Sequence, residues 1–159
     1  MSGPYIQRLR GIRDEYEVAR QSLAYVNQNW DGKSLFNSAF FQGIEEKTVN
    51  TAIQNIEVTY FVRLFAEFEG ILKDHLQTNH PAVKVPAKPK VDDLIALAVK
   101  QKPLKVASEL RKSELRKKVD DIRNYRNAIA HLSYGVVPIP FNDALSALNR
   151  FLAKLSDPL

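Results

Sequence analysis

The segment SELRKKVDDIRNYRNAIAH, residues 113–131, carries the clearest helical pattern of the chain. Its apolar residues recur every three or four positions and define one buried helix face: Leu115, Val119, Ile122 and, two turns later, Ile129. The same spacing places Arg126 in the apolar stripe. A guanidinium stays charged at ordinary pH, so its burial is costly unless a carboxylate, a phosphate or a wet cleft receives it. We therefore expect a partner for Arg126.

His131 follows Arg126 by five positions. In an ideal helix these two residues lie roughly 140° apart around the axis, because each residue turns the chain by about 100°. Asn127, four residues before His131, shares its face. One straight helix therefore does not place Arg126 and His131 in a single pocket. Either the helix loosens before Gly135, or a second copy of the chain completes the site.

The motif Arg126-Asn127-x-x-x-His131 resembles the R-N-x-x-x-H form of the arginine–histidine motif of HEPN domains. The resemblance rests on residues 123–131 and on their place near the end of the fourth predicted helix; elsewhere it covers only the pattern of helices. It implies a small all-α bundle, usually a homodimer, with the motif facing a cleft between subunits. It also implies either a metal-independent endoribonuclease, often a toxin or defence protein, or an inactive nucleotide-binding or scaffolding module.

Arg126, Asn127 and His131 suit the transphosphorylation of RNA, in which the ribose 2′-hydroxyl attacks the adjacent phosphate. Imidazole can act as base or acid near neutral pH, and arginine binds phosphate through two parallel hydrogen bonds. Asn127 could hold the imidazole ring or donate to a phosphate oxygen. The reaction needs both a base and an acid, whereas the motif supplies one histidine. We therefore expect a homodimer with a composite site and a 2′,3′-cyclic phosphate product.

Two other interpretations remain open. Arg126 could pair within the bundle while His131 stabilises a helix C-terminus, which leaves a non-catalytic module that binds nucleotide or RNA or serves as a dimeric scaffold. Alternatively, the chain could be a toxin held by a nucleotidyltransferase-type antitoxin that adenylylates a tyrosine just beyond the motif. Those toxins resemble Arg-x(4)-His-x-Tyr, whereas Tyr134 here stands one residue further from His131.

The remaining sequence predicts four more helices, and hence an all-α, HEPN-like, single-domain bundle of about five helices over residues 1–159. The first helix begins near Ser2 and carries a narrow stripe of the coiled-coil type: Leu9, Ile12, Tyr16, Ala19, Leu23 and Val26. Residues 48–78 form the longest pattern, with an apolar face broad enough for the central helix. Residues 30–46 are apolar for a connection, which favours a lid on the bundle over a partner-binding surface.

A proline-spaced connector, residues 81–90, precedes a short helix that Asp92 and Asp93 open near its positive end. Lys102-Pro103 ends this short helix. The last helix, capped by Asn142 or Asp143, faces inward with four leucines and an adjacent phenylalanine: Leu145, Leu148, Leu152, Leu155 and Phe151.

Two carboxylates of the long pattern at residues 48–78, Glu67 and Glu69, bear on the site. Glu67 or Glu69 could orient Arg126 across the bundle, or Glu67 could simply form a solvated pair with Arg63, four residues earlier. His75 and His80 are five residues apart and lack a third ligand, so we expect two surface histidines and no metal site.

The composition is typical of a soluble globular protein, with 45% hydrophobic and 26% charged residues. The absence of Cys excludes disulfides and a cysteine nucleophile, and no apolar run predicts a signal peptide or a membrane span. We therefore expect a cytoplasmic protein without cofactor. Residues 84–118 hold eleven Lys or Arg against four Asp or Glu, within a net charge of +5 for the chain. This basic segment suits either RNA or a solvated face.

Overall fold

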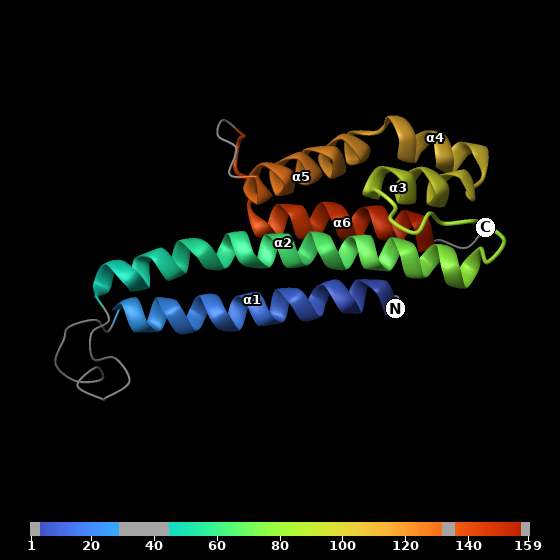
Figure 1. Ribbon diagram of the computed structural model, residues 1–159. Coiled ribbons are helices and arrows are strands. Elements are labelled where there is room, and N and C mark those ends of the chain that lie inside the picture. The colour runs from blue at the N-terminus through green and yellow to red at the C-terminus, as the bar shows by residue number, and fades with distance from the viewer. Residues whose placement is uncertain (1–3, 29–44, 132–135, 157–159) are drawn as a thin grey trace.

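The computed structural model describes residues 4–28, 45–131 and 136–156 (Figure 1). These ranges contain six helices and no strand: α1 Pro4–Gln28, α2 Glu46–Asn79, α3 Val91–Lys100, α4 Leu104–Lys112, α5 Glu114–Ala130 and α6 Phe141–Ser156. The predicted all-α class is therefore confirmed. None of these helices has the length and apolarity that a membrane crossing requires. The predicted cap at Ser2, nearly all of the predicted lid, and Tyr134 and Gly135 lie outside the described residues.

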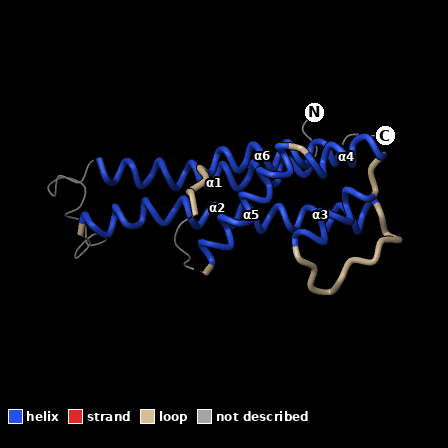
Figure 2. Tube along the Cα trace, turned by 90° about the horizontal axis from the view of Figure 1, so that it is seen from above, coloured by secondary structure: helices blue, strands red, loops and turns tan. Residues whose placement is uncertain are grey.

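Helices α1 and α2 form a long antiparallel pair, and the start of α2 projects beyond α5 and α6 (Figures 1 and 2). The stripe predicted on α1 faces α2, with Leu9 and Tyr16 buried and the other members half-buried. Helix α2 contacts α1, α3, α5 and α6, so the predicted central helix is confirmed. Its apolar residues recur at spacings of three and four and are fully buried from Phe61 to Leu76.

Helices α5 and α6 are antiparallel and pack on the same side of the α1–α2 pair (Figure 1). Tyr125 of α5 meets Phe61 of α2 edge to face, with ring centroids 4.8 Å apart. Tyr16 of α1 stacks on Phe141 of α6 at 4.2 Å. Side chains from all six described helices join one apolar cluster, so burial of this cluster fixes the position of α5.

Helix α5 begins where the sequence predicts, because the Ser113 side chain accepts a hydrogen bond from the backbone N–H of Arg116 at 3.3 Å. Leu115, Val119 and Ile122 are buried on its inner face, and Ile129 packs partly against the core. The helix ends at Ala130 with His131 as the C-cap residue. The structure thus holds the motif at the end of a helix, as expected, but this helix is the fifth described one.

Three details of the sequence analysis were wrong. Helix α4 was not predicted, although its Ala107 and Leu110 are buried at helical spacing. Helix α6 starts at Phe141, because the Pro140 carbonyl accepts from the N–H groups of Asp143 and Ala144 at 3.1 Å each; Asn142 and Asp143 therefore lie inside the first turn.

The third error concerns His75, which is buried rather than on the surface. Because α2 continues to Asn79, His75 falls in the same apolar stripe as Ile71 and Leu72. Its ring packs edge to face on Tyr5, and Asn79 donates to its Nδ1 at 3.1 Å. Burial lowers the pKa of His75, and the nearby positive charges of His80 and Lys102 lower it further.

Candidate functional site

Arg126 lies in a cleft of about 340 Å³ between α2, α5 and the start of α3. Nine residues line this cleft: Phe65 and Glu69 of α2; Lys90, Val91 and Asp92 at the start of α3; and Arg123, Asn124, Arg126 and Asn127 of α5. We call it the Arg126 cleft. Three cations, two carboxylates and two amides around one apolar wall make it a polar site that can hold an anion.

The guanidinium of Arg126 is half-buried and has no carboxylate partner among the described residues. Its Nε atom is buried without any hydrogen-bond partner, and Nη1 donates to the neutral Oδ1 of Asn127 at 3.1 Å. The prediction that Arg126 lies toward the interior is therefore confirmed. Since an unpartnered buried donor is costly, the group has unused capacity for an acceptor that enters the cleft.

Glu69, and not Glu67, faces Arg126 across the Arg126 cleft. Burial raises the pKa of the Glu69 carboxyl, and the positive charge of Arg126 partly opposes that rise. Glu67 instead accepts from Arg8 of α1 at 2.5 Å, and Arg63 donates to Glu15 of α1 at 2.6 Å. The predicted Arg63–Glu67 pair and the predicted role for Glu67 beside Arg126 are both wrong, because Arg63 and Glu67 each form an ion pair with a residue of α1.

Asp92 fixes the start of α3 against α5. It accepts from Arg116 at 3.1 Å and from Arg123, while Arg116 also pairs with Asp120 at 3.0 Å. Arg116 of the basic segment and Arg123, five residues beyond its end, are therefore both paired with a carboxylate. No sequence pattern predicts this network, because its partners stand 24 and 31 positions apart in the chain. Of the three cations in the cleft, Arg126 and Lys90 form no ion pair with any residue that the structure describes.

His131 is the C-cap of α5 and is exposed. Its backbone N–H donates to the Asn127 carbonyl at 3.0 Å, which holds the residue in place at the helix end. The imidazole does not line the Arg126 cleft. Within one chain, the structure therefore brings Arg126 and Asn127 together and leaves His131 outside, as the helical geometry predicts.

Most lysines of the basic segment are exposed over the connector, α3, α4 and the first turns of α5, and Lys90 reaches the rim of the Arg126 cleft. No group of three or more His, Asp or Glu within residues 4–28, 45–131 and 136–156 has the geometry to hold a metal ion.

Comparison of the chain with protein-family models, with curated proteins and with solved structures gives no match.

Proposed function

We propose that this protein is a metal-independent endoribonuclease that acts on RNA as a homodimer. The observation that carries the proposal is the state of Arg126. Its charged guanidinium occupies a polar cleft with a buried, unpartnered Nε, and its hydrogen-bond partner among the described residues is a neutral amide. A phosphate oxygen is the acceptor that such a group fits best, since arginine binds phosphate through two parallel hydrogen bonds.

The chemistry follows from the residue types. Arg126 and Lys90 bind the scissile phosphate and stabilise the charge that develops on it. One imidazole takes the proton of the 2′-hydroxyl, and a second gives a proton to the departing 5′ oxygen. His131 is one of the two, and His131 of the partner subunit is the other. The products are a 2′,3′-cyclic phosphate end and a free 5′-hydroxyl.

A second candidate function is a non-catalytic module that binds RNA or a nucleotide, or that serves as a dimeric scaffold. The observation that favours it is the position of His131, which is exposed at the helix end and outside the Arg126 cleft. In this alternative, Arg126 and Lys90 hold a phosphate without breaking a bond.

Cleavage of cellular RNA would make the protein a toxin or defence effector, with a nucleotidyltransferase-type antitoxin as its partner. The antitoxin would add AMP to Tyr134, which follows the motif. Intact-mass measurement after incubation with such a transferase and ATP tests this part of the proposal. A gain of one AMP that Tyr134→Phe abolishes supports it; an unchanged mass contradicts it.

RNA cleavage in excess EDTA tests the proposed function. We expect the wild-type protein to cut RNA, and Arg126→Ala and His131→Ala to lose at least about a hundredfold in rate, the scale of one general acid or base. Arg111→Ala and His80→Ala are matched controls, because both side chains lie outside the Arg126 cleft. Binding of RNA without cleavage by the wild-type protein would instead support the non-catalytic module.

Subunit mixing tests the composite site. Wild-type protein and His131→Ala are mixed in equal amounts and allowed to exchange subunits. Only wild-type homodimers then contain two copies of His131, and they make up one quarter of the dimers. The cleavage rate should therefore fall to about one quarter of the rate of the same total amount of wild-type protein. Independent sites in each chain would leave about one half.

A further inference from the structure

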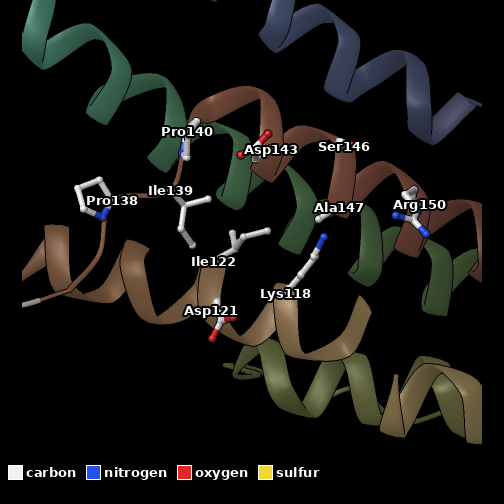
Figure 3. Close-up of a pocket in the computed structure, with 10 residues that line it drawn as sticks. All are labelled: Lys118, Asp121, Ile122, Pro138, Ile139, Pro140, Asp143, Ser146, Ala147 and Arg150. Carbon is white, nitrogen blue, oxygen red and sulfur yellow. The ribbon is translucent and has the colours of Figure 1, made fainter. Parts of the chain in front are cut away.

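A second cavity, of about 400 Å³, lies between α5 and α6 (Figure 3). Ten residues line it: Lys118, Asp121 and Ile122 of α5; Pro138, Ile139 and Pro140 before α6; and Asp143, Ser146, Ala147 and Arg150 of α6. We call it the α5–α6 cavity. Its α5 residues are spaced three and four apart and lie on a different face of the helix from Arg123 and Asn127, which line the Arg126 cleft. The two sites are therefore separate.

The α5–α6 cavity has a cationic end. Lys118 extends from α5 toward α6, and Arg150 lies on α6 one turn beyond Ser146 (Figure 3). Neither cation forms an ion pair or side-chain hydrogen bond with any described residue. By contrast, six arginines elsewhere in the described ranges are paired with carboxylates. Two unpaired cations and a hydroxyl thus converge on one cavity.

The other end of the cavity is apolar. Ile122 is 2% exposed, and Ile139 packs against the core from the segment that enters α6. Pro138 and Pro140 flank Ile139 (Figure 3). These side chains form a wall without donors, which suits the hydrocarbon or flat ring of a ligand. Asp121 and Asp143 also line the cavity, and their carboxylates balance the charges of Lys118 and Arg150, so an anionic group is attracted only where it contacts the two cations directly.

We propose that the α5–α6 cavity binds a small phosphate monoester, whose phosphate contacts Lys118, Ser146 and Arg150 and whose apolar body lies against Ile122 and Ile139. The volume is in the range of small-molecule sites. Phosphate suits the cationic end because arginine donates to two of its oxygens at once, while lysine and serine supply further donors. This site is independent of RNA cleavage at Arg126.

Calorimetric titration of the full chain with phenyl phosphate, inorganic phosphate and phenol tests the proposal. We expect phenyl phosphate to bind most tightly, because it alone carries both the anion and the ring. Lys118→Ala and Arg150→Ala should each weaken phenyl phosphate at least about tenfold, the typical loss for one charge-assisted hydrogen bond. Lys117→Ala and Arg111→Ala are matched controls that lie outside the cavity.

Ile139→Ser tests the apolar end of the α5–α6 cavity separately from its cationic end. It should weaken phenyl phosphate and leave the affinity for inorganic phosphate unchanged, and circular dichroism checks that each variant is folded. The proposal is overturned if phenyl phosphate does not bind at millimolar concentration, if it binds no better than inorganic phosphate, or if Lys117→Ala weakens it as much as Lys118→Ala.

Discussion

Arg126 of α5 faces Glu69 of α2 across the Arg126 cleft, and the positive charge of Arg126 opposes the rise that burial causes in the pKa of Glu69. The two side chains nevertheless form no ion pair, and the Arg126 Nε has no hydrogen-bond partner in the described part of the chain. A carboxylate thus holds the guanidinium electrostatically without occupying its donors, which leaves those donors available for a phosphate.

Glu69→Gln tests this relationship through the pH dependence of stability. A carboxyl with a raised pKa in the folded state contributes its stabilisation at pH values below its unfolded pKa, and that stabilisation is lost as pH rises through the folded pKa. We expect the wild-type protein to lose free energy of unfolding relative to Glu69→Gln as pH rises from about 4 toward neutral. Urea denaturation at several pH values measures the difference. A difference between the two proteins that does not change with pH would contradict the raised pKa.

Arg126→Met tests whether Arg126 serves ligand binding or the stability of the fold. Removal of one partner of a buried ion pair typically costs about 3–5 kcal/mol. Because Arg126 has no such partner, we expect its replacement to change the free energy of unfolding by less than about 1 kcal/mol while it abolishes RNA binding at the cleft. Urea denaturation and a filter-binding assay report the two effects. A loss of several kcal/mol would assign Arg126 to the fold.

Asp92→Asn tests whether the start of α3 is held by charge. Asp92 accepts from both Arg116 and Arg123, and these two arginines are 20% and 24% exposed. Asparagine keeps the shape but removes the charge, so we expect a loss of about 1–2 kcal/mol in the free energy of unfolding. Asp121→Asn, which removes an exposed carboxylate without an ion pair, is the matched control. Equal stability of both variants would show that the network does not fix α3.

His75→Phe tests the buried histidine. Because burial lowers the pKa of His75, its contribution to stability is complete above the unfolded pKa of about 6.5 and is lost as pH falls through that value toward the lower folded pKa. We expect the wild type to lose stability relative to His75→Phe as pH falls below about 6.5, because Phe keeps the ring packing on Tyr5 and has no group to protonate. The melting temperature as a function of pH measures this. His131→Gln, at an exposed position, should follow the wild type.

Much of the fold was predictable, because long helices with apolar stripes specify their own boundaries. Ser113 marks the start of α5, and the predicted ends of the longest pattern differ from those of α2 by one or two residues. Helix α4 escaped prediction because four of its nine residues are charged and its buried residues, Ala107 and Leu110, make only one short apolar repeat. His75 was predicted at the surface, although it stands four residues after Ile71 and three after Leu72 in the predicted helix, and this place in the apolar stripe buries it.

The candidate site was predictable only along α5 itself. The spacing of Arg126, Asn127 and His131 fixed which of them share a face. The contributions of Glu69, Lys90 and Asp92 depend on how α2 and α3 pack against α5, which no local pattern encodes. The choice between Glu67 and Glu69 was decided by Arg8 on α1, 59 residues away from Glu67 in the chain.

The chemical identity of the RNA 3′ end after incubation in EDTA decides whether the protein cleaves RNA by transphosphorylation. We expect the wild-type protein to produce 2′,3′-cyclic phosphate ends, and folded His131→Ala to produce none. Intact RNA after incubation with the folded wild-type protein, or the same cyclic ends from His131→Ala, would overturn this proposal.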